Sequence, residues 1–337
     1  MKRIFSAQVL VAAALASVAF ATPPAFAVTD PLEREANQSQ QAARSLLTAV
    51  TRNGDRLVAV GERGHVLLSD DAGATWRQAR VPVSVTLTAV AFADARNGWA
   101  CGHGAVILHT EDGGLTWTKQ FDGRTAAGGD DNADKPLLDI HFEDARHGFA
   151  IGAYGLAFTT VDGGRHWQSI AAGIPNPDGK HLYAMRRVGQ ILYIVGEQGA
   201  IFASSDGGNS FKPVASPYKG SFFDLVPIAD KVFLVAGLRG SVYRTADGGA
   251  TWARIDIASK DAVLAGARLA DGSVALVDGA GNLWRSDDAG KSFAGGRIAT
   301  PFPLSGIAQA SAAQFAVVGA RGVVVMPASR HEPVVRP

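Results

Sequence analysis

The sequence predicts an all-β protein, a seven-bladed β-propeller, and two observations carry this prediction. A short peptide recurs six times, at intervals of 41, 50, 44, 41 and 41 residues between its aspartates. Each copy follows apolar segments that alternate as strands do and are separated by a tight turn. Repeats of roughly 40 to 50 residues indicate stacked supersecondary units, and four strands per unit are typical of propeller blades. A linear β-solenoid is the alternative, although its rungs are usually shorter.

The first 27 residues have the features of a secretory signal peptide. Lys2 and Arg3 form a basic start, an apolar run follows, and Ala25-Phe26-Ala27 fits the small-x-small rule for cleavage after Ala27. An uncleaved anchor is the alternative, although the apolar run is short for a membrane span. We therefore expect an exported protein, periplasmic for example, whose mature chain has no membrane span.

Residues 28–44 are polar and lack strand alternation, so we expect a leader, with partial helix as one option, ahead of a single propeller over 45–337. Without the signal peptide the chain holds 30 Lys and Arg against 31 Asp and Glu. A near-neutral chain argues against nucleic acid as a partner. Cys101 is the single cysteine, which excludes an internal disulfide and favours a small buried residue.

The repeated peptide has the pattern Ser/Thr-x-Asp-x-Gly-x-Thr/Ser-aromatic, from which His166 departs at the seventh position. We expect it to form the turn between the two outer strands, c and d, of each blade. Its carboxylate and hydroxyl can bind backbone N–H groups, its glycine permits the turn, and its aromatic ring can pack in the blade seam. Spread over six blades, the acids should be structural and share no metal ion, and no cofactor is expected. These aspartates are Asp71, Asp112, Asp162, Asp206, Asp247 and Asp288.

A seventh unit keeps the turn Gly319-Ala320-Arg321-Gly322 but lacks the aspartate peptide. The segment that completes this blade is left open between the C-terminal HEPVVRP (331–337) and the early VTDPLE (28–33).

The fuller repeats FADARNGWACGHGAVILHTEDGGLTW (92–117) and FEDARHGFAIGAYGLAFTTVDGGRHW (142–167) resemble the photosystem II assembly/stability factor family of chloroplasts and cyanobacteria. Relatives of this family also occur in bacteria that do not photosynthesise, and the resemblance covers roughly residues 46–326. It implies an exported, non-enzymatic BNR/Asp-box propeller of seven blades that escorts or stabilises membrane-protein subunits. The seventh unit and an acidic, glycine-rich insert at 123–134 depart from the family pattern.

The tips of the turns between strands b and c are the candidate contacts with a partner. In a propeller these turns share one face with the d–a loops, and the aspartate peptides lie on the opposite face. Three arginines recur at one position of the b–c turns, and guanidinium groups suit carboxylates. An arginine patch on this face is also what the resemblance implies, whereas the alternative is that exposed turns simply carry polar residues. The candidates are Arg63, Arg239, Arg321, Glu62, His103, Tyr154 and Gln198, with Arg321 and Arg63 expected to be neighbours across the ring closure.

Two d–a loops on the same face are longer than the others, at 122–136 and 171–181. The first carries Asp130, Asp131 and Asp134 but lacks the spacing of an EF-hand, so a solvated loop is expected and Ca²⁺ binding is the alternative.

Three functions follow from this reading. The first is a monomeric binding factor whose partner is an integral-membrane client or an envelope complex. The second is a scaffold or accessory subunit of an envelope transporter, using the same face. The third is a sialidase-like glycoside hydrolase, because sialidases also carry Asp-boxes. The Arg-Ile-Pro motif of sialidases is absent, since Ile174-Pro175 follows Gly173, and no Tyr or Glu is placed beside the arginines by motif. We therefore expect no enzymatic activity.

Overall fold

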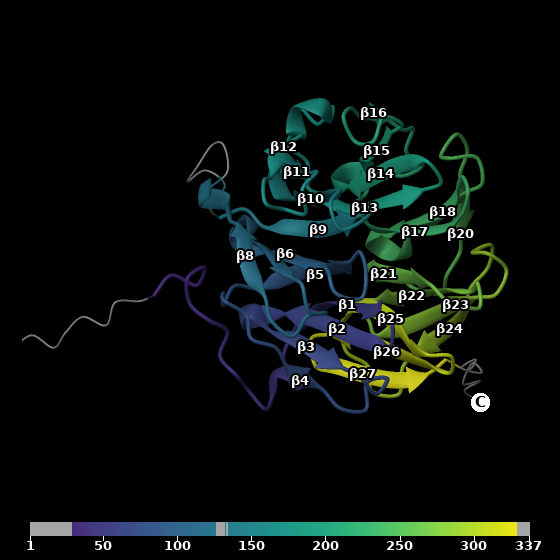
Figure 1. The fold of residues 1–337 in the computed structure, drawn as a ribbon. Helices are drawn as coiled ribbons and strands as arrows, with labels where there is room; N and C mark the ends of the chain where they lie inside the picture. The colour runs from purple at the N-terminus through teal and green to yellow at the C-terminus, as the bar shows by residue number, and fades with distance from the viewer. Residues whose placement is uncertain (1–28, 126–131, 133, 329–337) are drawn as a thin grey trace, which may run out of the picture.

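The computed structural model describes residues 29–125, 132 and 134–328, which form a seven-bladed β-propeller (Figure 1). Each blade is an antiparallel sheet in which successive strands pair with their neighbours along the chain. Strand a of each blade lines a central channel and the later strands lie further out. The all-β prediction and the number of blades are confirmed.

The first six blades have four strands each. Blades one to three comprise β1 (Leu47–Asn53), β2 (Arg56–Gly61), β3 (Val66–Ser69) and β4 (Arg77–Gln78); β5 (Leu87–Phe92), β6 (Gly98–Gly102), β7 (Ile107–Thr110) and β8 (Thr118–Phe121); and β9 (Leu137–Phe142), β10 (Gly148–Gly152), β11 (Ala157–Thr160) and β12 (Gln168–Ser169). Blades four to six comprise β13 (Leu182–Val188), β14 (Ile191–Gly196), β15 (Ile201–Ser204) and β16 (Lys212–Pro213); β17 (Phe222–Ala229), β18 (Val232–Gly237), β19 (Val242–Thr245) and β20 (Ala253–Ile255); and β21 (Val263–Arg268), β22 (Val274–Asp278), β23 (Asn282–Ser286) and β24 (Ala294–Arg297).

Helical structure in the described residues is limited to single 3₁₀ turns. These are η1 (Ala42–Arg44), η2 (Glu62–Gly64), η3 (His103–Ala105), η4 (Gly123–Thr125), η6 (Ala153–Gly155), η7 (Ala171–Gly173), η8 (Glu197–Gly199) and η9 (Leu238–Gly240). No helix among them is long and apolar enough to cross a membrane.

The core lies between neighbouring blades, because each sheet packs one face against the sheet before it and the other against the sheet after it. Strand b is therefore buried along nearly its whole length and reads as a continuous apolar run, as in Val58-Ala59-Val60. Between blades two and three, Trp99 stacks on Phe142 with ring centroids 3.5 Å apart. Each of these interfaces is a hydrophobic cluster that ties two blades together.

Blade seven has three strands in the described part of the chain: β25 (Leu304–Ser311), β26 (Gln314–Gly319) and β27 (Gly322–Pro327). It closes the ring against blade one, where β1 contacts both β25 and β26 (purple beside yellow in Figure 1). The Ser305 hydroxyl donates to the Leu47 carbonyl oxygen (2.8 Å) across this junction. Val318 joins Leu47 in one buried cluster.

The polar leader does not complete blade seven, which removes one of the two candidate segments. Its Leu32 and Ala36 are buried in the cluster between blades one and two, because these apolar side chains cover the outer seam there. Backbone hydrogen bonds hold it in place, from Ser84 to Pro31 (2.8 Å) and from Ala36 to Val81 (2.9 Å). Its only described helical residues are the 3₁₀ turn η1, which contacts β27. The other candidate, 331–337, lies outside the described residues.

Candidate partner-binding face

The six aspartate peptides form the c–d turns, and each is closed by the same hydrogen bonds. In the first copy, the Asp71 carboxylate accepts hydrogen bonds from the Ser69 hydroxyl (2.8 Å), the Thr75 N–H (2.9 Å) and the Thr75 hydroxyl (2.6 Å). The Gly73 N–H donates to the Ser69 hydroxyl (2.8 Å). These bonds, led by the one from the Thr75 hydroxyl, lower the pKa of Asp71 to about 2.

His166 replaces the usual hydroxyl in the third copy without breaking this pattern. Its ring Nδ1 lies 2.7 Å from Oδ2 of Asp162, and its N–H donates to Oδ1 (3.0 Å). The side-chain bond from His166 is the main reason that the pKa of Asp162 falls to about 2.

The aspartate peptides also connect neighbouring blades. Arg56 of blade one donates to the Gly113 carbonyl oxygen (2.9 Å), and Tyr193 of blade four donates to that of Gly248 (3.0 Å). No cluster of three potential metal-ligating His, Cys, Asp or Glu side chains occurs among the residues that the structure describes. The peptides therefore act as turns and blade connectors.

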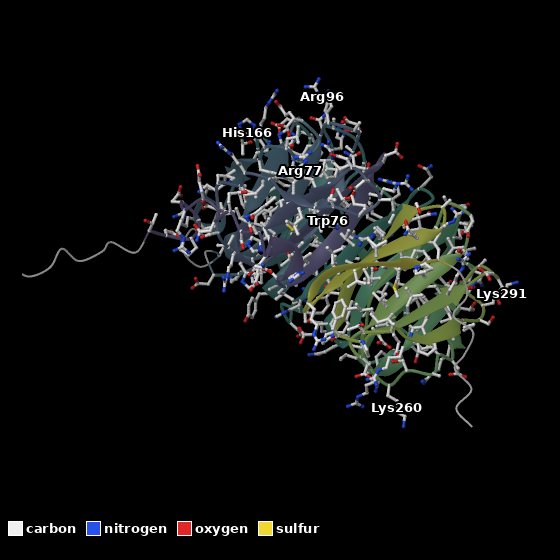
Figure 2. All side chains as sticks on the ribbon, turned by 90° about the horizontal axis from the view of Figure 1, so that it is seen from below. Trp76, Arg77, Arg96, His166, Lys260 and Lys291 are labelled. Carbon is white, nitrogen blue, oxygen red and sulfur yellow. The ribbon has the colours of Figure 1, made fainter. Side chains whose placement is uncertain are left out.

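The b–c turns lie at the other end of the blades, on one face with the d–a loops. In Figure 2, Arg96 and His166 of the aspartate-peptide face are at the upper edge of the view, and Lys260 of a d–a loop is at the lower edge. The five 3₁₀ turns η2, η3, η6, η8 and η9 join strands b and c, and each holds its middle residue in a left-handed conformation. The middle residues are Arg63 (φ 57°), Gly104 (φ 71°), Tyr154 (φ 55°), Gln198 (φ 53°) and Arg239 (φ 57°).

The candidate residues occupy different positions of these turns. Arg63 and Arg239 share one backbone position, and Tyr154 and Gln198 occupy the same position in blades three and four. Arg321 lies in a shorter turn, in which the left-handed residue is the following Gly322 (φ 87°). Glu62 and His103 precede the left-handed residue of their turns.

The charged side chains of these turns differ in their partners. The side chains of Arg63, Arg239 and Arg321 are exposed, and in the described part of the chain they form no hydrogen bond or ion pair. The two glutamates instead accept backbone hydrogen bonds, Glu62 from the Leu46 N–H (3.3 Å) and Glu197 from the His181 N–H (3.2 Å). The cations of the turns are therefore free to bind an acidic partner, whereas the acids are held by the protein itself.

Tyr154 is 62% exposed and belongs to a row of rings that the sequence analysis missed. Its ring lies 4.8 Å from that of His181, which lies 6.1 Å from Tyr183, which lies 5.0 Å from Phe223. Tyr183 and Phe223 are each the second residue of strand a in their blades. The aromatic residue at the second position of LYAMRR and FFDLVP could have indicated this row from the sequence.

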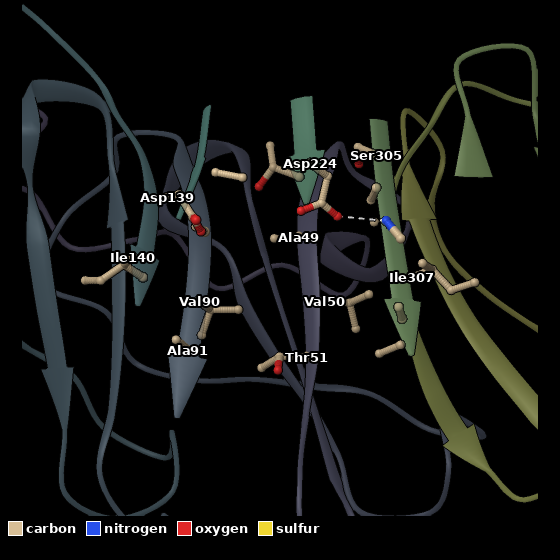
Figure 3. Close-up of a pocket in the computed structure, with 18 of the residues that line it drawn as sticks. Ala49, Val50, Thr51, Val90, Ala91, Asp139, Ile140, Asp224, Ser305 and Ile307 are labelled. Carbon is tan, nitrogen blue, oxygen red and sulfur yellow. Dashed lines mark hydrogen bonds between the residues drawn. The ribbon is translucent and has the colours of Figure 1, made fainter. Parts of the chain in front are cut away.

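The central channel has a volume of about 660 Å³ and is lined by residues of the a strands (Figure 3). The second residue of strand a carries a hydroxyl in blades seven, one and two. Each hydroxyl donates to a carbonyl of the following blade, as Thr48 does to Leu87 (2.6 Å) and Thr88 to Leu137 (2.7 Å). In blades three to six the same position is large and apolar or aromatic: Leu138, Tyr183, Phe223 and Leu264. The channel mouth thus has one half with small hydroxyl side chains and one half with large apolar or aromatic side chains.

Deeper in the channel, Arg186 lies between two buried acids that the sequence analysis also missed. It donates to Asp139 of blade three and to Asp224 of blade five (3.3 Å). Burial raises the pKa of the Asp224 carboxyl, against the opposing effect of Arg186. Burial acts to lower the pKa of Arg186, but the charges of Asp139 and Asp224 prevail and raise it.

The described parts of the two long loops join strand d of one blade to strand a of the next, as expected. In the first, Asp122 is buried and forms ion pairs with Lys119 (3.0 Å) and Arg124 (2.7 Å). The suggested ion-binding residues Asp130 and Asp131 fall outside the described residues, and Asp134 is exposed. In the second loop, Asn176 closes the chain around Lys180 and thereby positions His181.

Cys101 is fully buried in strand b of blade two, as expected. Burial raises the pKa of its thiol, which disfavours the reactive thiolate form.

Comparisons with known proteins agree with this architecture. The family model described as photosynthesis system II assembly factor YCF48 matches residues 72–132 and 128–273. The uncharacterized protein YkuO of Bacillus subtilis is 32% identical over 75 residues, which are 22% of this chain and 25% of that protein. The chain therefore spans about a quarter of that relative.

Two solved structures have the same fold over most of this chain. YCF48 from Cyanidioschyzon merolae superposes with a TM-score of 0.65 at 18% identity, covering 86% of this chain and 97% of that one. A structure described as YCF48 bound to D1 peptide superposes with a TM-score of 0.65 at 18% identity, covering 87% of this chain and 96% of that one. At this identity the likeness concerns the fold alone.

Proposed function

Since this chain belongs to the photosynthesis system II assembly factor YCF48 family, we propose that it is a non-enzymatic binding protein for an acidic peptide segment of a partner protein. The segment binds on the face of the b–c turns and d–a loops. The observation that carries the proposal is a contrast: Arg63, Arg239 and Arg321 have no side-chain partner among the described residues, whereas Glu62 and Glu197 accept backbone hydrogen bonds.

The chemistry of these turns supports a carboxylate-bearing ligand. A guanidinium presents a planar fork of donors that matches a carboxylate. The short turns hold the backbone of the three arginines in place, and their long side chains can still change conformation to meet a carboxylate. A structure of another family member is described as bound to D1 peptide, which supports a peptide as the ligand class here.

The setting we propose is the periplasm or another exported compartment, reached by cleavage after Ala27. The partner we propose is an integral-membrane client or an envelope complex, held by a monomeric propeller. An accessory role in a transporter would use the same face and the same arginines. The identity of the partner therefore distinguishes a transporter subunit from a factor that binds a membrane-protein client. No feature of the described residues favours the hydrolase.

Anisotropy of labelled peptides tests the proposal. One peptide alternates Glu and Gly, and its counterpart alternates Lys and Gly. We expect the mature protein to prefer the acidic peptide, and the double variant Arg63→Glu with Arg321→Glu to weaken this binding by at least about tenfold.

The matched control carries the same charge change on the opposite face. Arg146 and Arg165 are exposed there, and Arg146→Glu with Arg165→Glu should leave binding unchanged. Equal binding of both peptides, or equal loss in both double variants, contradicts the proposal.

A further inference from the structure

We propose that Tyr154, His181, Tyr183 and Phe223, here called the aromatic ladder, bind the proline or aromatic side chains of an extended peptide whose carboxylates bind the neighbouring cations. This inference rests on the proposed function and adds to it the apolar chemistry of the ligand. The ladder runs from the rim of blade three, across blade four, to the strand a of blade five.

The ladder is continuous. Successive ring centroids are 4.8, 6.1 and 5.0 Å apart, within the range of attractive aromatic contacts. Its outer ring, Tyr154, is 62% exposed on its turn. Its inner rings, Tyr183 and Phe223, are the second residues of strands that follow d–a loops, and both line the channel. A ligand on this face therefore meets a path of ring surfaces that leads to the channel mouth.

Hydrogen bonds hold the backbone that carries the outer rings of the ladder. The Asn176 amide donates to the Lys180 carbonyl (2.9 Å) and its oxygen accepts the Lys180 N–H (3.0 Å), which fixes the loop that carries His181. His181 is further held by two hydrogen bonds with Glu197, through its N–H (3.2 Å) and its carbonyl oxygen (2.9 Å). A Cβ at Gly155 would lie 3.0 Å from the Asn176 amide, so the Tyr154 turn packs closely on the same loop. Rings that are already ordered lose little entropy on binding.

Glu197 lies beside the ladder, where it accepts the His181 N–H, so the cations that suit an acidic peptide are those of blade five. Arg239 and Lys219 are exposed beside blade five, and neither side chain has a partner among the described residues. Leu238, next to Arg239, is 37% exposed. Aromatic grooves bind extended, proline-rich segments through ring faces, and the free cations add a site for flanking carboxylates.

Three synthetic peptides and anisotropy test this inference. The first joins Phe-Pro-Phe-Pro to Glu-Gly-Glu-Gly-Glu-Gly, the second replaces every Phe and Pro by Ser or Gly, and the third replaces every Glu by Lys. Each is made in both orders of its two halves, and cellohexaose serves as a non-peptide ligand with stacking faces. We expect the mature protein to bind the first peptide about tenfold more tightly than the second, and the third weakly.

The variant Tyr154→Ser with Tyr183→Ser should abolish the preference for the first peptide over the second while leaving the second peptide's affinity unchanged. Tyr154→Ser alone, at a 62% exposed ring, should reduce the preference in the same direction and guards against misfolding of the double variant. The control is Val161→Ser on the aspartate-peptide face, where Val161 is 61% exposed. It should change nothing.

Equal affinity for the first two peptides would overturn the ladder and leave the proposed function standing. Binding of none of the three would overturn both. Ladder-dependent binding of cellohexaose without binding of the peptides would show that the rings serve a sugar, which contradicts the peptide ligand.

Discussion

Arg186 of blade four donates a hydrogen bond through Nη1 to the buried carboxylate of Asp139 in blade three. The same carboxylate accepts the Met185 N–H (2.7 Å), and the second arm of Arg186 reaches Asp224 in blade five. Asp224 in turn accepts the Gly266 N–H of blade six (2.8 Å), and Figure 3 shows both acids among the residues of the channel. Arg186 thus links blades three, four and five, and Asp224 extends the network to blade six.

We expect Arg186→Met to destabilise the protein by about 3 kcal/mol, because it leaves two buried carboxylates without a counter-charge. Denaturant unfolding measures this loss. Adding Asp139→Asn and Asp224→Asn to that variant should restore part of the stability, since the uncompensated charges are then removed. An Arg186→Met protein as stable as the wild type would show that this network does not hold the blades.

Trp117→Ala should cost about 3–5 kcal/mol of stability, because it empties a large site between blades. The Trp117 ring is 5% exposed, and its Nε1 donates to the Gly114 carbonyl (2.9 Å). Trp252→Ala is the matched control, since that ring ends the same repeat in blade five but is only half-buried. Calorimetry should show the larger loss for Trp117, and equal losses would contradict the seam role.

Asp122 predicts an acid-sensitive ion-pair cluster at the end of blade two, whose cations Lys119 and Arg124 also pair with Glu33 of the leader. Hydrogen bonds from Arg124, and then from Lys119, lower its folded-state pKa from 3.8 to about 2. Its contribution is therefore fully present above pH 3.8 and is lost as the pH falls towards 2. Unfolding free energies measured between pH 6 and 2 should fall less steeply for Asp122→Asn than for the wild type. Parallel curves would contradict this assignment.

Ser305→Ala should weaken ring closure by about 1 kcal/mol, the net contribution of one hydrogen bond. Its hydroxyl joins blade seven to Leu47 of blade one (2.8 Å). Ser311→Ala, at the far end of the same strand, is the control and should have a smaller effect on urea unfolding. If both variants unfold at the same urea concentration, the hydroxyl does not contribute to closure.

The blades and their turns could be predicted because their chemistry is local. The turn of the first copy is closed by Asp71, Ser69 and Thr75, which lie within seven residues. A short stretch of sequence is therefore enough to predict this turn. The b–c turns could also be predicted from short stretches of sequence. The shorter turn around Arg321 shows, however, that similar residues need not give the same backbone conformation.

The channel and the ladder could not be predicted in this way. Asp139, Arg186 and Asp224 are distant in sequence and meet only because the ring brings successive a strands together. The position of the leader depends on the packing of Leu32 between blades one and two. The hydrophobic pattern of the leader does not reveal this long-range contact.

Site-specific photo-crosslinking in the protein's own cell envelope tests whether a partner binds on the face of the b–c turns. A photoreactive residue is placed at Gln198, exposed on a b–c turn, and in a second protein at Glu111, exposed on the opposite face. We expect position 198 to crosslink to an acidic segment of a single membrane-protein partner, identified by mass spectrometry. We also expect Arg63→Glu with Arg321→Glu to remove that product. Crosslinks from position 111 alone, or products that persist in the double variant, would contradict binding through the free arginines.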